Sequence, residues 1–233
     1  MRKLIIAIDG PAGAGKSTVA KRLAMELGYT YMDTGAMYRA FAWKVKKEET
    51  DLGNEKELKK ALEETRIELM EQNSHLRVLI DGVDVTVQIR TPEISQMASK
   101  VSALKMVREK MVEFQRVIGS QGGVVVEGRD IGTVVFPEAD VKIYLDASSQ
   151  ERAKRRFEEI KGQGKPVTLG KTFEEMEERD RRDKEREFAP LRKAEDAIVI
   201  DSTESGVEAV VDRVRLEIQK KMKSLDEDWR ITT

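Results

Sequence analysis

A glycine-rich loop near the start of the chain restricts the possible folds more than any other feature. Residues 10–17 read Gly-Pro-Ala-Gly-Ala-Gly-Lys-Ser, the pattern G-x-x-x-x-G-K-[ST], and they directly follow the apolar run at residues 4–8. A loop of this kind joins a buried strand to the start of a helix. Apolar residues recur at helical spacing over residues 19–27. The sequence therefore predicts a strand, a phosphate-binding loop and a helix, with a glycine-rich turn that binds nothing as the alternative.

The residue types in this loop suit a polyphosphate. Glycines let the backbone aim successive N–H groups inward, and the helix adds the positive end of its dipole. We expect Lys16 to reach the β- and γ-phosphates, and the Ser17 hydroxyl to bind a Mg²⁺ ion that bridges them. The predicted nucleotide-binding residues of the loop are Gly10, Pro11, Ala12, Gly13, Ala14, Gly15, Lys16, Ser17 and Thr18.

Length, charge and cysteine content exclude several classes of protein. The 233 residues suffice for one sizeable α/β core. The 42 Lys and Arg residues balance 43 Asp and Glu, so the whole protein does not attract a nucleic acid polymer or an anionic membrane. The absence of cysteine excludes disulfides and thiolate chemistry. Without a long apolar run or a signal-peptide pattern, we expect a cytoplasmic protein, most simply a monomer.

Short apolar runs alternate with longer helical patterns along most of the chain. This alternation is typical of βα units in a parallel sheet, and strands covered on both faces are apolar throughout. The fold class predicted is α/β, a three-layer fold of the P-loop NTPase type with a five-stranded parallel sheet. The expected strands are residues 4–8, 29–32, 124–127, 141–145 and 197–200.

Helix-start signals occur at three places. Residues 148–151 (Ser-Ser-Gln-Glu) and 172–175 (Thr-Phe-Glu-Glu) have the capping-box pattern, and Pro92 after Thr91 suits a first helical turn. The second box predicts a highly charged helix over residues 172–188.

Residues 50–90 interrupt the alternation. They predict a helix at 55–65 and two strands at 76–80 and 83–87, joined by Asp-Gly, the strongest short-range hairpin signal. A second irregular segment, residues 161–166, is either a lid hinge or a plain loop. The organisation predicted is one domain with a core at about 1–49, 91–150 and 190–233, an insert at about 50–90 and a lid region at about 151–189.

The chain lacks the Asn-Lys-x-Asp segment of a GTPase and the basic track of a polymer motor. A small-molecule phosphotransferase remains, and abundant arginines favour a phosphate as acceptor. Two phosphates within about 4 Å repel by roughly 10 kcal/mol at an effective dielectric near 20, and Arg grips phosphate oxygens in pairs. A phosphate acceptor needs no general base, so we expect the single histidine, His75, on the surface. The candidate arginines are Arg39, Arg108, Arg129, Arg152, Arg155, Arg156, Arg179 and Arg186.

Four further segments extend the pattern of the phosphate-binding loop. They are Asp-Thr-Gly-Ala-Met-Tyr-Arg at 33–39, Ile-Arg-Thr-Pro-Glu at 89–93, Glu-Gly-Arg-Asp-Ile-Gly-Thr-Val-Val-Phe-Pro at 127–137, and Arg-Asp-Arg-Arg-Asp at 179–183. With these segments, the chain resembles bacterial cytidylate kinases in order from the loop to Asp-Ser-Thr at 201–203.

The resemblance implies a nucleoside monophosphate kinase that moves the γ-phosphoryl group of MgATP to CMP or dCMP, with an NMP-binding insert and a short lid. It implies that Ser99, Arg108 and Asp130 contact cytosine, and that Thr34 and Asp183 lie near the sugar. It assigns the substrate phosphates to Arg39, Arg129, Arg179 and Arg186, the donor side of the lid to Arg152 and Arg156, and catalysis to Lys16, Arg129, Arg179 and Arg186.

Other interpretations stay open at this point. Asp130 could instead satisfy backbone N–H groups, and the charged helix could be an ordinary solvated surface. Glu127 stands where the family more often has Asp, so we assign it no role. A kinase for UMP or another small phosphorylated acceptor, and an ATP-dependent switch protein, are the alternative functions.

Overall fold

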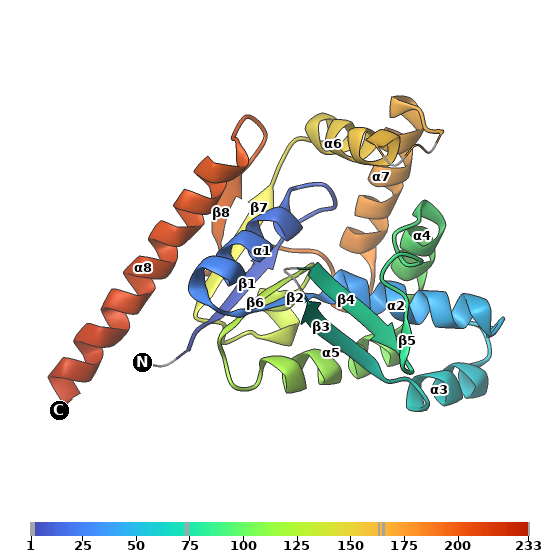
Figure 1. Ribbon diagram of the computed structural model, residues 1–233, viewed down its shortest axis with the longest axis horizontal. Helices are drawn as coiled ribbons and strands as arrows, with labels where there is room; N and C mark the ends of the chain where they lie inside the picture. The colour runs from blue at the N-terminus through green and yellow to red at the C-terminus, as the bar shows by residue number, and fades with distance from the viewer. Residues whose placement is uncertain (1–2, 73–74, 163, 165, 233) are drawn as a thin grey trace. The chain divides into compact units, whose positions relative to one another are not determined.

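The computed structural model describes residues 3–72, 75–162, 164 and 166–232 (Figure 1). Its strands are β1 (Ile5–Asp9), β2 (Thr30–Asp33), β3 (Ile67–Gln72), β4 (His75–Ile80), β5 (Val83–Asp84), β6 (Val124–Gly128), β7 (Val141–Asp146) and β8 (Ile198–Asp201). Its helices are α1 (Lys16–Leu27), α2 (Thr34–Lys47), α3 (Glu55–Glu63), α4 (Pro92–Val101), α5 (Lys105–Gly119), α6 (Ser149–Gly162), α7 (Leu169–Glu185), α8 (Val207–Thr232) and the π-helix η1 (Ile131–Val135). In the described residues, no helix is both long and apolar enough to cross a membrane.

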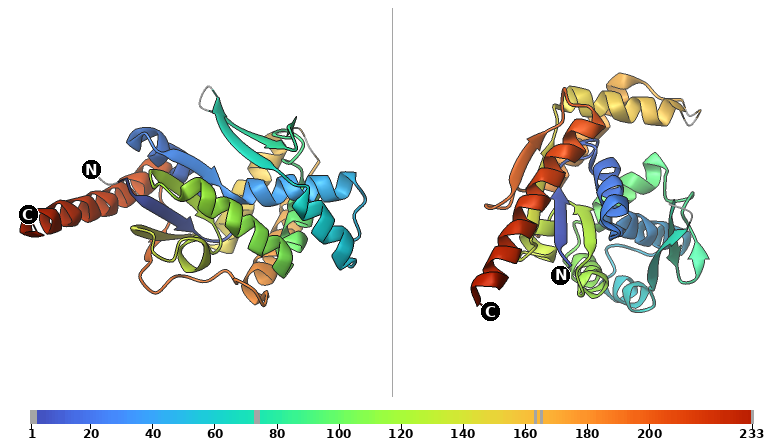
Figure 2. Two further views of the ribbon diagram at one scale, coloured as in Figure 1. Left: turned by 90° about the horizontal axis from the view of Figure 1, so that it is seen from below. Right: turned by 60° about the vertical axis from the view of Figure 1, so that its left-hand side comes forward.

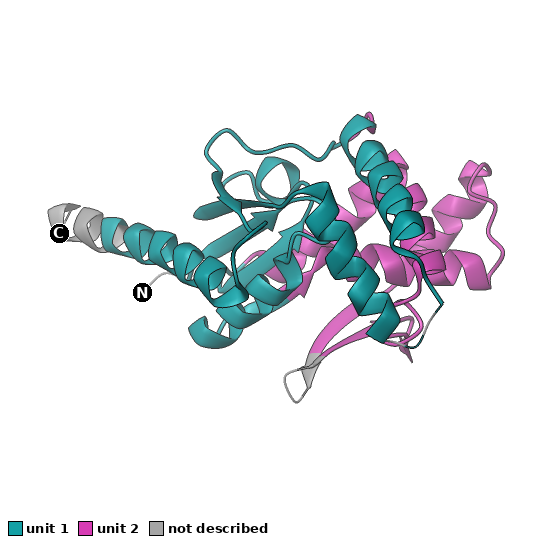
Figure 3. Cartoon of the chain, turned by 90° about the horizontal axis from the view of Figure 1, so that it is seen from above, with its two compact units in different colours: residues 1–31, 121–185, 189–233 teal, residues 32–120, 186–188 magenta. Residues whose placement is uncertain are grey.

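The chain forms two compact units, coloured separately in Figure 3. Unit 1 contains residues 1–31, 121–185 and 189–233, and unit 2 contains residues 32–120 and 186–188. The predicted insert at 50–90 lies within unit 2, which is wider than that insert and includes α2, α4 and α5.

Unit 1 contains β1, β6, β7, β8 and the first half of β2 from the five-stranded sheet, whose strand order is β2-β6-β1-β7-β8. β1 pairs in parallel with both β6 and β7, and β7 pairs in parallel with β8. The inner strands β1 and β6 are almost completely buried, as their largely apolar sequences require. α1 packs against β6 and against α8 (Figure 2). The predicted α/β class and five-stranded parallel sheet are confirmed, with each strand within one residue of its expected bounds.

The helix starts show which capping signals the sequence uses. The Thr91 hydroxyl accepts from the Ile94 N–H at 3.2 Å, directly before Pro92 at the first position of α4. The Ser148 hydroxyl accepts from the Glu151 N–H at 3.3 Å at the start of α6. Both of these predicted starts are confirmed.

The predicted start of the charged helix at residue 172 is wrong. α7 begins at Leu169, because the hydroxyl of Thr168 accepts from the Lys171 N–H at 3.3 Å and so caps the first turn. The Thr172 hydroxyl instead donates to the Thr168 carbonyl at 2.9 Å from within the helix. α7 also ends at Glu185, three residues before the predicted end. The predicted hinge at 161–166 includes residues 163 and 165, which lie outside the described part.

Unit 2 contains an antiparallel sheet of order β3-β4-β5, against which α2 packs at β4. The Asp-Gly hairpin is confirmed, with Ile80 paired to Val83 and positive φ at both turn residues, 51° and 77°. The second strand is shorter than predicted. Asp84 turns the chain because its carboxylate accepts from the N–H and hydroxyl of Thr86 at 2.9 and 2.6 Å. β3 was not predicted.

Candidate functional site

The phosphate-binding loop leaves the sheet at the end of β1 and enters α1, whose N-cap is Gly15. Gly10 has a φ of 149°, and a Cβ there would lie 2.0 Å from the Leu145 carbonyl oxygen. Glycine is therefore required at this position by both conformation and space. The predicted order of strand, loop and helix is confirmed.

The Lys16 side chain is buried, with 6% of the residue exposed. Its Nζ donates to the Pro11 carbonyl at 2.6 Å. Burial lowers the pKa of Lys16 to about 7, repulsion by Arg129 acts in the same direction, and attraction to Glu127 opposes both. A bound phosphate would favour the charged ammonium and raise this pKa. Lys16 is thus a strong candidate ligand for an anion.

A second part of the site follows β6, where Arg129 and Asp130 lead into η1. Asp9, the last residue of β1, accepts from the N–H groups of Ile131 and Gly132, both at 2.8 Å. π-helical turns are rare and often occur at functional sites. Asp9 therefore fixes the backbone directly after two predicted substrate-binding residues.

The ionised Asp9 carboxylate is unfavourable in this position, because it is buried. Burial raises the pKa of Asp9 to about 6 from an ordinary 3.8, and the two backbone hydrogen bonds only partly offset that rise. A carboxylate whose pKa is higher in the folded state contributes stability that is fully present below its unfolded pKa and declines between that value and the folded pKa. The advantage is lost as the pH rises through about 6.

We expect Asp9→Asn to remove this pH dependence of stability. Between pH 4.5 and 7.5 the free energy of unfolding of the wild type should fall by roughly 2 kcal/mol relative to the Asn variant, because only the wild type must ionise a buried carboxyl. Urea unfolding of both proteins at the two pH values measures this difference. Parallel pH profiles would show that Asp9 keeps an ordinary pKa.

α7 brings two of the predicted arginines to one carboxylate. The Asp183 carboxylate lies 2.9 Å from Arg129 Nε and 4.0 Å from Arg179 Nε. Burial acts to lower the pKa of Arg129, but the ion pair and hydrogen bond with Asp183, together with attraction to Asp180 and Glu127, raise it overall. Both arginines also affect the pKa of Lys16, so unit 1 gathers three cationic groups that suit a highly charged anion.

The two predicted lid arginines on α6 behave differently. Arg152 is buried; its Nη1 donates to the loop carbonyl of Ala12 at 3.1 Å and contacts Asp180 at 2.5 Å, while its Nε donates to Ala147. Arg156 instead pairs at 2.7 Å with the exposed Glu159. Of the two, Arg152 is therefore the one that contacts the phosphate-binding loop, and the lid roles of both arginines stay predictions.

Unit 2 carries another group of predicted residues. Thr34 is buried as the first residue of α2, and Asp33 caps this helix by accepting from the Ala36 N–H at 2.8 Å. The second oxygen of the Asp33 carboxylate binds Arg39 at 2.8 Å. Arg39 is thus held next to the start of α2. Arg186 belongs to the short segment 186–188 of the same unit.

Ser99 and Arg108 are both hydrogen-bonded to Ser102, the residue that follows the end of α4. Arg108 donates to the Ser102 carbonyl at 3.2 Å and stacks 5.5 Å from the centre of the Tyr38 ring. The Ser102 hydroxyl donates to the Ser99 carbonyl at 3.0 Å. The Ser99 hydroxyl is buried without a hydrogen-bond partner among the described residues. An unsatisfied buried hydroxyl costs free energy, which makes Ser99 a candidate ligand.

Sequence reasoning missed Asp9 and Asp180. The signal for Asp9 is an acidic residue that ends an otherwise apolar strand, and the signal for Asp180 is its place in the Arg-Asp-Arg-Arg-Asp motif. Glu127, assigned no role from sequence, is buried and accepts a hydrogen bond from the Tyr31 hydroxyl. The His75 side chain lies outside the described part of the chain.

The residues present fit a Mg²⁺ ion held mainly by nucleotide phosphates. The exposed Ser17 hydroxyl lies in the first turn of α1, and the described residues contain no cluster of three His, Cys, Asp or Glu side chains. Mg²⁺ in such sites keeps several waters and uses few protein ligands.

Comparisons with known proteins agree with these features. A family model described as cytidylate kinase matches residues 6–220. A cytidylate kinase of Caldicellulosiruptor bescii is 50% identical over 214 residues, 92% of this chain and 95% of that protein. The cytidylate kinase of Bacillus subtilis is 49% identical over 222 residues, 95% of this chain and 99% of that protein. That of Syntrophotalea carbinolica is 47% identical over 225 residues, 97% of this chain and 96% of that protein.

Proposed function

Because this chain belongs to the cytidylate kinase family, we propose that it transfers the γ-phosphoryl group of ATP to CMP or dCMP, giving ADP and CDP or dCDP. The observation that carries the proposal is the family match over residues 6–220, which includes the phosphate-binding loop and every predicted site residue. The cationic cluster of Lys16, Arg129 and Arg179 in unit 1 supports it, because phosphoryl transfer between two nucleotides needs strong neutralisation of charge.

On the donor side, the loop amides and Lys16 would hold the β- and γ-phosphates, and Arg152 would complete this site from α6. Ser17 would hold the Mg²⁺ ion, which supplies charge neutralisation between the phosphates when bound. An oxygen of the acceptor phosphate forms the new bond to the γ-phosphorus, and the bond from that phosphorus to the β–γ bridging oxygen breaks. No proton has to be removed from the acceptor.

On the acceptor side, Arg39, Arg129, Arg179 and Arg186 would bind the phosphates, with Thr34 and Asp183 near the sugar. Ser99, Arg108 and Asp130 would recognise cytosine. The exocyclic amine of cytosine is a donor for the Asp130 carboxylate, whereas uracil offers a carbonyl there. A site that leaves a buried polar group unpaired discriminates strongly.

Assays of ADP release with CMP, dCMP, UMP and AMP test this proposal. We expect CMP and dCMP to exceed UMP by about a hundredfold or more in kcat/KM. Arg108→Ala should reduce that preference at least tenfold, and Arg116→Ala, an exposed arginine on the same helix, should leave it unchanged. Comparable rates with UMP would favour a kinase for UMP or another small phosphorylated acceptor. Nucleotide binding without turnover of any monophosphate would favour the ATP-dependent switch.

We also propose that the chain acts as a monomer in the cytoplasm on these small-molecule substrates, without a nucleic acid polymer or a membrane. Light scattering at assay concentrations tests the oligomeric state.

A further inference from the structure

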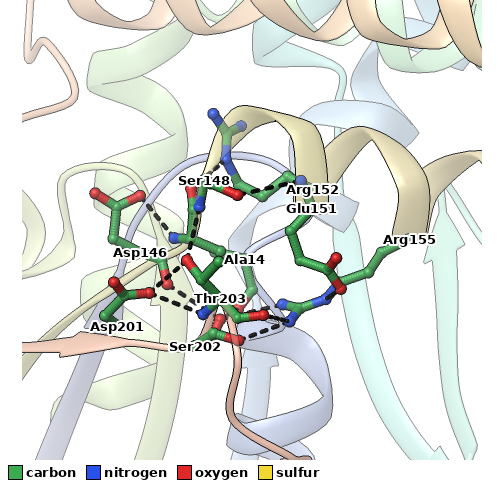
Figure 4. Close-up of polar contacts among 10 residues, drawn as sticks. Ala14, Asp146, Ser148, Glu151, Arg152, Arg155, Asp201, Ser202 and Thr203 are labelled. Atoms are coloured by element: carbon green, nitrogen blue, oxygen red, sulfur yellow. Dashed lines mark hydrogen bonds and ion pairs between the residues drawn. The ribbon is translucent and has the colours of Figure 1, made fainter.

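The proposed function gives no task to the Asp-Ser-Thr segment at 201–203. This segment follows β8, the edge strand of the sheet, and its side chains form a network with α6 (Figure 4). Ser202 is at the centre of this network, with 4% of the residue exposed. Its hydroxyl lies 3.1 Å from the Ala14 carbonyl in the phosphate-binding loop and 3.0 Å from the Asp146 carbonyl.

Arg155 sets the direction of this hydroxyl. Its Nη1 donates to Ser202 Oγ at 3.1 Å and its Nη2 to the Ser202 carbonyl at 2.6 Å. Because a guanidinium can only donate, Ser202 Oγ must accept from it, and the hydroxyl proton is left for a carbonyl. The Asp146 carbonyl already accepts from the Ser202 N–H at 2.8 Å. We therefore take the Ala14 carbonyl as the acceptor of the hydroxyl proton. A charged donor also polarises the hydroxyl and strengthens its own donation.

A bond to the Ala14 carbonyl orients more than that oxygen. The peptide unit is planar and trans, so the carbonyl of Ala14 and the N–H of Gly15 point in opposite directions. A donor that holds the carbonyl from one side therefore fixes the direction of the next N–H on the other. Arg152 at Ala12 and Lys16 at Pro11 hold two more loop carbonyls in the same manner.

We propose that Ser202, held by Arg155, is a positioning residue that orients the Gly15 N–H of the phosphate-binding loop for a polyphosphate. This proposal rests on the proposed function only in taking that loop as the donor site. Donors held in place before the ligand arrives cost no reorganisation on binding. Ser202 would therefore act on the affinity for the triphosphate and leave the affinity for the acceptor unchanged.

The test compares Ser202→Ala with the wild type in steady-state kinetics. We expect the KM for ATP to rise about five- to twentyfold, roughly the size of one lost hydrogen bond, and the KM for CMP to stay within about twofold. Ser202→Thr keeps the hydroxyl and should recover most of the affinity for ATP. An unchanged KM for ATP, or an equal rise for both substrates, would overturn the proposal.

A matched control separates positioning from simple support of the loop after β8. The Thr203 hydroxyl belongs to the same network, where it accepts from the Ser148 N–H at 2.9 Å and donates to Asp201; among the described residues it forms no hydrogen bond with the phosphate-binding loop. Thr203→Val should lower the melting temperature about as much as Ser202→Ala but leave the KM for ATP unchanged. If both variants weaken ATP equally, Ser202 has only a structural role.

Inorganic tripolyphosphate, which carries no base, distinguishes an effect on the loop from a direct contact with adenine. Calorimetry should show its Kd rising in Ser202→Ala by the same factor as that of ATP. A rise for ATP alone would overturn the proposal. The measurement needs no CMP and no turnover, so failure of the proposed substrate would appear separately, as a wild type that binds tripolyphosphate but phosphorylates neither CMP nor dCMP.

Discussion

Lys16→Ala should lower kcat for phosphoryl transfer by about a thousandfold or more, while the affinity for CMP changes by less than about threefold. Lys16 is buried in the phosphate-binding loop and is repelled by Arg129 and Arg179. A bound phosphate supplies the negative charge that makes the buried ammonium favourable. The alanine variant loses that compensation at the transferring group. Coupled assays of ADP release give kcat, and calorimetry without ATP gives the affinity for CMP.

Lys21→Ala is the matched control, because Lys21 is an exposed lysine on the same helix. It should retain kcat within about twofold. A Lys16→Ala enzyme with more than a tenth of the wild-type kcat would contradict the role assigned to this ammonium. A parallel loss of CMP binding would mean that the substitution disturbs the site as a whole.

Gly10→Ala should destabilise the fold by at least about 3 kcal/mol, the range of severe overpacking. The new Cβ would lie 2.0 Å from the Leu145 carbonyl oxygen. Because the atoms that it meets belong to the Leu145 backbone, no side-chain rotation can relieve the clash. The φ of 149° adds strain, because a residue with a Cβ rarely adopts it. Urea unfolding measures the loss of stability, and the yield of folded protein reports it if the variant does not accumulate.

Gly28→Ala separates the steric clash from the conformational strain. Gly28 also has a positive φ, 63°, but a Cβ there would meet no atom within 4 Å. Its substitution should cost only about 1–2 kcal/mol. Equal losses at the two positions would mean that strain alone, and not the contact with Leu145, determines the requirement for glycine at residue 10.

The sheet could be predicted from sequence because burial on both faces leaves a plain signal. Residues 4–8 and 124–127 are apolar without interruption or nearly so, and they became central strands. β3 gave no such signal, because Glu68 and Glu71 make it resemble the charged helix before it. Its pairing with β4 is a tertiary property, since the cross-strand partners and not the local residues select it.

The candidate site shows the same division. The phosphate-binding loop was predictable because its chemistry is contained in eight consecutive residues. Arg152 and Arg156 could not be told apart, since they are four residues apart on one helix and share a face. What separates them is Asp180 on α7, 28 positions along the chain from Arg152. Asp9 likewise takes its role from η1, which lies 122 positions further on.

The hydrogen bonds to the carbonyls of the phosphate-binding loop also affect when the loop becomes ordered during synthesis. Residues 10–17 leave the ribosome early, but two of the side chains that hold their carbonyls, Arg152 on α6 and Ser202, come much later in the sequence. A nascent chain that stops before β8 would carry the complete loop sequence without the last of these side chains. If Ser202 orients the loop as proposed, tight binding of nucleotide would require that synthesis has passed β8, and shorter translation products would bind it more weakly.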